Sequence, residues 1–489
     1  MILRIFGHDF HYECENLCRV YFPNEKINIV YDGEGTDSKE VVTRCIPVDG
    51  GNRIEVSAEI DGKKAELDAL VEACADELRD KSELKTAQLI FAALSELTGY
   101  TPPWGVLTGV RPSKLMLRLI ADMGEDAAMN YFLGSLLVSP EKAKLAKTVA
   151  NAEEKIVNLS KDNSFSLYVS IPFCPTRCSY CSFVSHSIAN SNAKKLLPEY
   201  LDKLAEEIEL TGAVASELGL KLESVYFGGG TPGVLEAPQM DRLLSGIEKA
   251  FDLSTVREYT VEIGRPDTVT PEKLRVLKLH DVGRISINPQ TFNQRTLELI
   301  GRNHSVEQSV KAYMLAKTYG FKSINMDLIA GLPEETYDDF VASVDTAVAL
   351  SPENITVHTL ALKRSSELNA SGAGVADGNT AKRMLEYASS ALSGKGYAPY
   401  YMYRQSKCVG NLENVGWCLD GHDCLYNVFM MEECHSVFAV GAGAVTKLRE
   451  PGSTNIERIF NYKYPYEYIS GFDKITERKN GIKSFYLSY

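Results

Sequence analysis

Short apolar runs alternate with amphipathic stretches between about residues 164 and 366. The apolar runs are Phe165–Pro172, Leu222–Gly229, Arg257–Ile263, Arg284–Asn288, Ser323–Ile329 and Asn354–Leu362. The stretches between them, such as Lys194–Leu218 and Tyr337–Leu350, carry apolar side chains at helical spacing. Nearly continuous apolar strands separated by helices are typical of a parallel sheet covered by helices. Six such units predict an α/β fold, a partial (β/α)6 barrel over residues 164–366, with an open doubly wound sheet as the alternative.

The chain on either side of this segment follows other patterns. Short strands are expected in the N-terminal part at Ile2–Phe6, Lys26–Tyr31 and Arg53–Ile60. From Lys63 onward the pattern is mostly helical, with helices expected at Val71–Leu78, Thr86–Thr98, Pro112–Met123 and Pro140–Leu159. We therefore predict an N-terminal α+β domain over residues 1–163, without a role we can assign. Residues 367–489, rich in Tyr and Gly, are predicted to form a C-terminal α+β region.

Composition narrows the class of protein. The 489 residues, 44% hydrophobic and 24% charged, are ordinary for a globular protein, and the length suggests two or three domains. A formal net charge of -13 argues against nucleic acid as the main partner. The opening residues lack a small-residue cleavage site, and no apolar run approaches the ~20 residues that span a bilayer. We expect a cytoplasmic protein without a membrane partner, whose eleven cysteines are thiols or metal ligands.

Three cysteines stand in the spacing C-x-x-x-C-x-x-C directly after the first apolar run, at Cys174, Cys178 and Cys181. Three thiolates on one short loop can hold three irons of a [4Fe–4S] cluster and leave the fourth iron open, whereas electron-transfer clusters are closed by four cysteines. An open metal position is where a substrate or cofactor binds, as in catalytic zinc sites. The spacing therefore indicates radical S-adenosylmethionine (SAM) chemistry. A zinc knuckle or three buried thiols are the alternatives.

Further candidate residues lie where the later strands are expected to end. The second apolar run ends in Phe227-Gly-Gly-Gly-Thr-Pro232, and a glycine run lets the backbone approach a small polar ligand closely. Glu262, Gln290 and Asp327 occur at the ends of later runs. In barrels of this kind the carboxyl ends of the strands gather the reactive groups at one rim. Because a charge in an apolar strand needs a partner, these three residues favour a bound ligand there.

The motifs resemble those of the oxygen-independent coproporphyrinogen III oxidase (dehydrogenase) family of radical SAM proteins. Besides the three cysteines, the matching segments are Tyr168-Val-Ser-Ile-Pro-Phe-Cys174, Gly228-Gly-Gly-Thr-Pro232, Glu262, Gln290-Thr-Phe292, Gly301-Arg-Asn-His304 and Asp327-Leu-Ile-Ala-Gly-Leu-Pro333. The resemblance covers about residues 167–362 and continues more weakly beyond them. The long N-terminal extension and the stretch Tyr403–Trp417 look most like the HemZ branch of the family.

The resemblance implies cofactors and roles. The cysteine triad would hold a [4Fe–4S] cluster whose open iron takes the amino and carboxylate groups of SAM. The residues bordering the methionine part would be Tyr168, Tyr180, Gly229, Gly230 and Thr231. The residues contacting the ribose or the carboxylate would be Glu262, Gln290, Arg302 and Asp327.

The resemblance also implies a reaction. A reductant such as flavodoxin or ferredoxin would supply one electron, and SAM would be cleaved to methionine and a 5′-deoxyadenosyl radical. In the family that radical takes a hydrogen atom from a propionate of the tetrapyrrole substrate. Loss of CO₂ and one electron leaves a vinyl group, an oxidoreductase step of porphyrin and haem biosynthesis.

Three positions depart from the family pattern. Ser170 stands where many members have histidine, and Gly264-Arg265-Pro266 replaces the usual Ala-Asn-Pro after the glutamate. Ser182-Phe183 follows the third cysteine, whereas the established oxidases carry a fourth cysteine two positions on. Relatives that handle haem also lack this fourth cysteine. A haem-binding or chaperone protein on the same scaffold is therefore one alternative, and a radical SAM enzyme acting on another tetrapyrrole is a second.

The haem alternative can be examined in the C-terminal region. Haem-chaperone relatives carry His-Asn-x-x-Tyr-Trp there, whereas this chain has Glu413-Asn-Val-Gly-Trp417. Glutamate is not among the usual axial haem ligands, although His422 and His435 lie nearby in the sequence. Four irregularly spaced cysteines are expected to be buried thiols rather than a second metal site: Cys408, Cys418, Cys424 and Cys434.

Overall fold

The computed structural model describes residues 1–23, 25–31, 37–183, 185–363, 366, 368, 374–405 and 407–489. The chain divides into two compact units, each built around its own sheet. The first unit comprises Met1–Ala150, Asp377–Arg383 and Met402–Glu413. The second comprises Asn151–Ala376, Met384–Tyr401 and Asn414–Tyr489. The predicted domain limits at residues 163 and 366 remain predictions.

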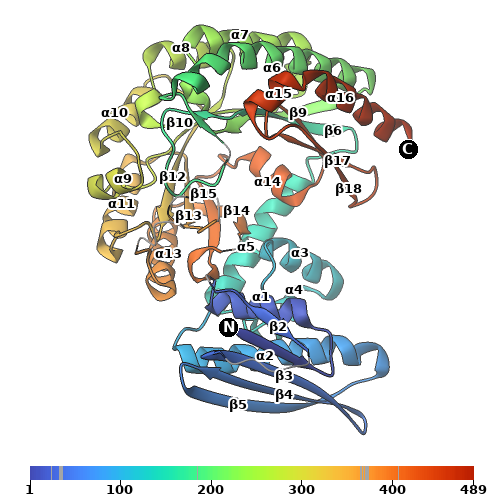
Figure 1. The fold of residues 1–489 in the computed structure, drawn as a ribbon. Coiled ribbons are helices and arrows are strands. Elements are labelled where there is room, and N and C mark those ends of the chain that lie inside the picture. Colours follow the sequence, from blue (N-terminus) through green and yellow to red (C-terminus); the bar gives the residue numbers. More distant parts are fainter. Residues whose placement is uncertain are drawn as a thin grey trace. The chain divides into compact units, whose positions relative to one another are not determined.

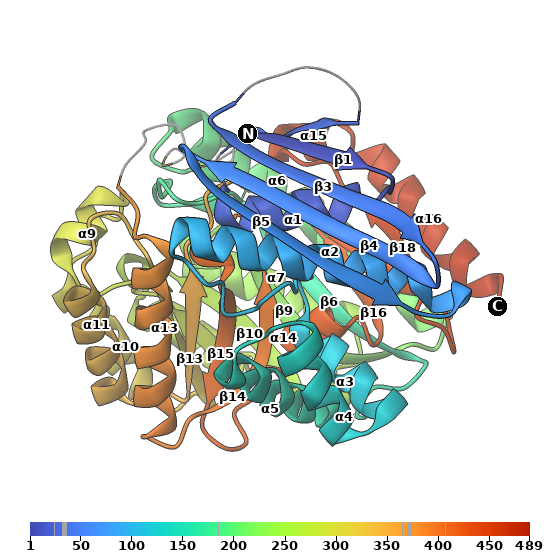
Figure 2. The same ribbon diagram turned by 90° about the horizontal axis from the view of Figure 1, so that it is seen from below.

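The first unit contains a five-stranded sheet in the order β2-β1-β3-β4-β5. Its strands are β1 (Ile2–Phe6), β2 (Asn28–Val30), β3 (Lys39–Val48), β4 (Gly51–Ile60) and β5 (Lys63–Glu72). The helices along this part of the chain are α1 (His11–Tyr21), α2 (Ala75–Thr98), α3 (Pro112–Met123), α4 (Glu125–Asn130) and α5 (Pro140–Val157). β1 pairs in parallel with β2 and β3, whereas β3, β4 and β5 are antiparallel. α2 packs along the sheet against β4 and β5 (Figure 2).

The helical prediction from Lys63 onward is wrong for residues 63–72, which form β5. Ala65 and Val71 are buried and are separated by exposed positions, as expected for a strand with one covered face. β4 and β5 join through Asp61 and Gly62, both with positive φ, the backbone of a tight hairpin turn. Apolar and charged residues alternate from Ala65 to Ala69, but the exposed Leu70 beside Val71 interrupts the pattern, and pairing with β4 fixes the strand.

The second unit contains an eleven-stranded sheet in the order β14-β15-β13-β12-β11-β10-β9-β6-β16-β17-β18. Its six central strands are β6 (Ser164–Ile171), β9 (Lys221–Gly229), β10 (Glu258–Gly264), β11 (Arg284–Ile287), β12 (Ser323–Ala330) and β13 (Asn354–Thr359). These six are parallel and match the six apolar runs of the sequence. The connecting helices are α6 (Ser191–Glu217), α7 (Ala237–Ala250), α8 (Pro271–Leu279), α9 (Gln294–Leu299), α10 (Val306–Lys317) and α11 (Tyr337–Leu350). They follow the outer side of the sheet (Figure 1), which confirms the partial barrel.

The C-terminal region extends both edges of this sheet. Its strands are β14 (Ala398–Arg404), β15 (Glu413–Cys418), β16 (Ser436–Val440), β17 (Val445–Arg449) and β18 (Ile456–Phe460). Its helices are α13 (Gly378–Ser393), α14 (Leu425–Glu432), α15 (Pro465–Ser470) and α16 (Phe472–Leu487). β15 runs antiparallel to β13 at one edge, while β16 runs parallel to β6 at the other. Within the described part of the chain, no helix has both the length and the apolar character required to cross a membrane.

The turn between β16 and β17 packs against Ser170, one of the three departures from the family pattern. Gly441 has φ +95°, and a Cβ there would lie 2.7 Å from the Ser170 carbonyl oxygen and 2.5 Å from Tyr200 Oη. Ser170 Oγ donates a hydrogen bond to the Ala442 carbonyl at 2.8 Å. The 4% exposed side chain of Ser170 is enclosed by this turn.

Candidate active site

Polar side chains from neighbouring strands share one face of the central sheet. Tyr168 of β6 is the register partner of Tyr226 of β9, and their rings stack at 6.3 Å. Tyr226 Oη donates to the carboxylate of Glu262 on β10. Asp327 on β12 shares this face, and its Oδ2 lies 3.7 Å from His358 Nε2 on β13. Side chains alternate along a strand, so the pairing register brings these five groups to the same side.

The carboxylate and imidazole groups on this face are electrostatically coupled. Burial raises the pKa of Glu262 to about 7; the hydrogen bond from Tyr226 opposes this shift and the charge of Asp327 adds to it. Burial lowers the pKa of His358, but hydrogen bonds with Asp327 and Asn414 outweigh it, so that pKa is raised overall. Near neutral pH, Glu262 therefore exchanges a proton readily, while Asp327 and Asn414 stabilise the protonated form of His358 against its burial.

The cysteine loop begins where β6 ends. A two-residue strand, β7 (Phe173–Cys174), pairs with β8 (His186–Ser187) and ties the two ends of the loop together. Gly230 lies directly against this loop, because a Cβ there would come within 2.9 Å of Cys174 Sγ. Its neighbour Thr231 donates through its backbone N–H to the Phe173 carbonyl at 2.8 Å and through Oγ1 to Cys174 Sγ at 3.4 Å. The glycine run and the cysteine loop predicted from the sequence are thus in direct contact.

Arg302 reaches the cysteine loop from the segment after α9. Its side chain is buried and donates to the Asn288 carbonyl and to Tyr180 Oη, the latter at 3.2 Å. Its Nε is buried without a hydrogen-bond partner among the described residues. The backbone carbonyl of Gly301 accepts a hydrogen bond from Thr176 Oγ1 of the loop at 3.1 Å. Arg302 and Tyr180 therefore lie together beside the cysteines.

Gln290 is held close to Asp327 by backbone hydrogen bonds. It adopts a positive φ of 73°, which is uncommon for a residue with a side chain. Its N–H donates to the Asp327 carbonyl at 2.9 Å, and its own carbonyl accepts from Ile329 N–H at 2.9 Å. Strained backbone of this kind concentrates at functional sites, where the surrounding structure enforces it.

The residues present fit an iron–sulfur cluster. Cys174, Cys178 and Cys181 are partly exposed and interact electrostatically with one another. Among the described residues, no three His, Cys, Asp or Glu side chains converge on a point where one metal ion could bind. A cubane cluster does not need such convergence, because each thiolate binds a different iron. Unpaired buried N–H groups of Arg265 and Arg302 beside the loop suit an anionic group placed there.

Glu413, which occupies the place of the chaperone histidine, is held inside the first unit. Its side chain is 2% exposed, accepts a hydrogen bond from Trp104 Nε1 at 2.7 Å and forms an ion pair with Lys142. A carboxylate engaged in this way has a structural role in holding the unit together.

The two nearby histidines also have partners within the protein. His435 is 3% exposed, and its ring nitrogens bond to Ser160 Oγ at 2.9 Å and Ser166 Oγ at 2.8 Å. Burial lowers the pKa of His435 to about 3. His422 Nδ1 bonds to Ser323 Oγ at 2.8 Å. Among the four C-terminal cysteines, which are all buried, Cys424 donates to Glu258.

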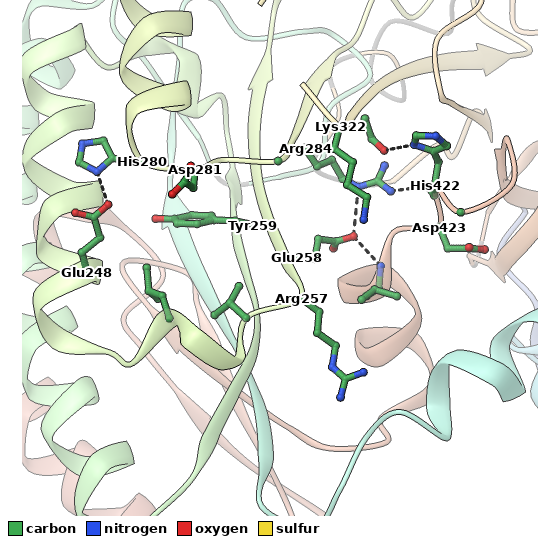
Figure 3. Close-up of a pocket in the computed structure, with 16 residues that line it drawn as sticks. Glu248, Arg257, Glu258, Tyr259, His280, Asp281, Arg284, Lys322, His422 and Asp423 are labelled. Carbon is green, nitrogen blue, oxygen red and sulfur yellow. Dashed lines mark hydrogen bonds and ion pairs between the residues drawn. The ribbon is translucent and has the colours of Figure 1, made fainter. Parts of the chain in front are cut away.

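A cavity of ≈ 320 Å³ lies where β10, β11 and β12 begin, at the opposite end of the strands from Cys174 (Figure 3). Two of its buried charged groups, Arg284 and Glu258, pair with each other. Arg284 donates to Glu258 at 3.3 Å and to the His422 carbonyl at 2.5 Å. Glu258 also accepts from the backbone N–H of Leu425 at the start of α14, 2.9 Å away. This end of a barrel generally serves stability, and the paired charges here close it against α14.

The fold and the cysteine site together define the radical SAM class. The radical SAM superfamily model matches residues 168–347, which include the cysteine loop and five of the six central strands. A solved structure of coproporphyrinogen III oxidase HemN from Escherichia coli superimposes with a TM-score of 0.52 at 21% identity, covering 67% of this chain and 73% of that one. This similarity supports the fold.

Two curated relatives narrow the class further. The oxygen-independent coproporphyrinogen-III oxidase-like protein HemZ of Bacillus subtilis is 35% identical over 98% of this chain and 97% of its own length. The heme chaperone HemW of Haemophilus influenzae is 30% identical over 64% of this chain and 78% of its own length. The chain belongs to the oxygen-independent coproporphyrinogen III oxidase family of radical SAM proteins, in its HemZ-like branch. Its cofactors are a [4Fe–4S] cluster and SAM.

Sequence reasoning missed Tyr226, His358 and Tyr426. Tyr426 of α14 stacks on Tyr226 at 4.3 Å and on Tyr168 at 6.1 Å. Strand parity could have identified Tyr226, since it lies two residues before the glycine run and shares a face with Gly228. It could also have identified His358, which lies two residues after Thr356, the register partner of Asp327, and therefore shares its face. Nothing in the sequence brings Tyr426 to this face, because α14 arrives from the C-terminal region.

Proposed function

We propose that this protein is a radical SAM enzyme that converts propionate side chains of a tetrapyrrole into vinyl groups, with coproporphyrinogen III as its substrate. The observation that carries the proposal is the joining of the cysteine loop, the glycine run and the face around Glu262 at one end of one sheet. When bound, the cluster and SAM supply one-electron cleavage of SAM and removal of a hydrogen atom from the substrate. The side chains of the protein would bind and orient SAM and the substrate.

The residues beside the cysteine loop have the properties required to hold SAM. The absence of side chains at Gly229 and Gly230 lets the end of β9 pack directly against Ile171, Phe173 and Cys174, which would place the backbone of this glycine run beside the cluster. Arg302, buried and with an unpaired Nε among the described residues, would take the carboxylate of the methionine part. Tyr168, Tyr180 and Thr231 would border that part. Together these contacts would orient SAM before reduction.

The carboxylates on the sheet face are suited to the ribose. Asp327 is fixed by Asn325 Nδ2, which donates to it at 2.7 Å, so a free lone pair can accept from a hydroxyl. Glu262, with its pKa near 7, can either accept or donate a hydrogen bond there. Gln290 would be the third residue to contact the ribose. His358, whose Nε2 lies 3.7 Å from Asp327 Oδ2, would hold that carboxylate in place.

The test is an anaerobic incubation of reconstituted protein with SAM, a reductant, coproporphyrinogen III and an electron acceptor, followed by mass spectrometry. In each conversion one hydrogen atom passes to the deoxyadenosyl group, CO₂ leaves and one electron goes to the acceptor. We expect 5′-deoxyadenosine and stepwise loss of CO₂ and hydrogen from two propionates. Cys178→Ala, which removes one cluster ligand, should abolish both. Deoxyadenosine formation with coproporphyrinogen unchanged would refute the substrate.

A haem-binding function is the second candidate, because several relatives are named heme chaperones. Against it, Glu413 replaces the histidine of those relatives and is engaged by Trp104 and Lys142. Titration with haem, followed by absorbance and gel filtration, tests this candidate. Retention of stoichiometric haem without conversion of coproporphyrinogen would favour delivery over catalysis.

A further inference from the structure

Arg265 places a buried cation against the cysteine loop. Its side chain is 2% exposed, and Nε donates to Asp267 Oδ1 at 3.1 Å. Nη1 donates to Thr176 Oγ1 at 3.1 Å and lies 3.7 Å from Cys178 Sγ. Nη2 is buried and has no hydrogen-bond partner among the described residues. An unpaired buried N–H group is costly, so its presence beside a cluster-binding loop indicates a missing acceptor.

The backbone around Arg265 fixes the direction of this side chain. The chain leaves β10 through Gly264, whose φ is +79°. Arg265 N–H donates to the Ile263 carbonyl at 2.9 Å, and the Arg265 carbonyl accepts from Thr268 Oγ1 at 2.7 Å. With its neighbours held in this way and its own side chain enclosed, the guanidinium has no route to solvent. It is oriented toward the loop before any cofactor binds.

The charges buried around Arg265 also indicate that an anion binds there. Arg265 and Arg302 are two buried guanidinium groups that both interact with the cysteine loop. Asp267 is the carboxylate that pairs with Arg265. His304, fully buried 3.8 Å from Asp267, is neutral because burial lowers its pKa to about 3. An excess of buried positive charge is stable only with an anionic partner, and a cluster held by three thiolates is anionic.

We propose that Arg265 is a positioning residue for the iron–sulfur cluster, donating from Nη1 to the Cys178 thiolate and from Nη2 to a cluster sulfide. Hydrogen bonds and positive charge at the sulfurs stabilise the reduced form, which carries one more negative charge. Arg265 therefore raises the reduction potential, so that an external one-electron donor reduces the cluster more readily. This role concerns the cluster alone and is independent of which tetrapyrrole the enzyme takes.

The experiment compares Arg265→Gln with the reconstituted full-length wild-type protein. The midpoint potential is measured by anaerobic redox titration monitored by electron paramagnetic resonance, without tetrapyrrole. We expect reduction to become at least about tenfold less favourable, which for one electron corresponds to a fall of about 59 mV. Arg257→Gln is the matched control, because Arg257 lies just before the other end of β10 and pairs with Glu223. Its potential should equal that of the wild type.

A second variant covers the case in which Arg265→Gln does not retain the cluster. Arg265→Lys keeps the charge but has one nitrogen in place of three, so it cannot bond Asp267, the loop and the cluster at once, and a smaller fall in potential is expected. An unchanged potential in Arg265→Gln with full iron and sulfide content would overturn the proposal. If only Arg265→Lys holds a cluster, an unchanged potential in that variant would overturn it equally. Because neither measurement involves coproporphyrinogen, failure here is distinct from failure of the proposed reaction.

Discussion

Gly230→Ala is expected to disrupt the cysteine loop. The added Cβ would lie 2.6 Å from the Phe173 carbonyl oxygen, 2.9 Å from the Phe173 nitrogen and 2.9 Å from Cys174 Sγ. Two of these atoms belong to the backbone of β7 and cannot rotate away, so the loop must move. Overpacking of this kind costs roughly 1–3 kcal/mol, and the displacement also moves one cluster ligand. We expect lower stability of the cluster-free protein and reduced iron content after reconstitution.

The assay is thermal unfolding of the cluster-free protein by circular dichroism, together with iron analysis after reconstitution. A loss of about 1–3 kcal/mol corresponds to a fall in Tm of roughly 1.5–4.5 °C for a unit of this size. Gly246→Ala in α7 is the control, because a Cβ there meets nothing within 4 Å. Replacing a helical glycine by alanine should stabilise the protein by up to about 1 kcal/mol. Unchanged Tm and full iron content in Gly230→Ala would refute the reasoning.

Two further predictions concern pH dependence and a buried ion pair. The pKa of Glu262 is raised in the fold, so the contribution of this carboxyl group to stability is greatest below about pH 4.5 and is lost as pH rises toward 7. Glu262→Gln should remove about 3 kcal/mol of this dependence, measured by urea unfolding across that range. A wild type and variant with parallel pH profiles would contradict this. Lys142→Met leaves the carboxylate of Glu413 buried without its cation and should cost about 3–5 kcal/mol. The control is the more exposed ion pair of Lys147 with Glu125, where Lys147→Met should cost at most about 1 kcal/mol. Equal losses of stability in the two variants would contradict the larger contribution expected of the buried pair.

The six central strands of the large sheet were predictable because each is a nearly continuous apolar run between helices. The pattern located all six, including Leu222–Gly229 and Asn354–Leu362, to within a few residues. In contrast, β3 and β5 belong to a sheet with one covered face, and adjacent apolar residues, Val41-Val42 in β3 and Leu70-Val71 in β5, interrupt their alternation. Their strand conformation depends on pairing with β4, which is a tertiary effect that local pattern does not encode.

The candidate site was predictable for residues that directly follow a strand. It was not predictable for residues whose position depends on contacts with remote parts of the chain. The cysteine loop and Gly230 are brought together because β6 and β9 are parallel neighbours. Arg265 was visible in the sequence as a departure from the family pattern. Its direction depends on the turn after β10 and on Thr176, which is remote in sequence. Tyr426 joins the site only because the C-terminal region supplies α14.

The most direct test of the central claim is an isotope-transfer experiment. Coproporphyrinogen III deuterated at the propionate carbon next to the ring is incubated anaerobically with reconstituted protein, SAM, reductant and an electron acceptor. Mass spectrometry should find deuterium in 5′-deoxyadenosine and a vinyl group in the tetrapyrrole product. Unlabelled 5′-deoxyadenosine together with intact coproporphyrinogen would contradict the claim that this enzyme removes a hydrogen atom from a propionate side chain.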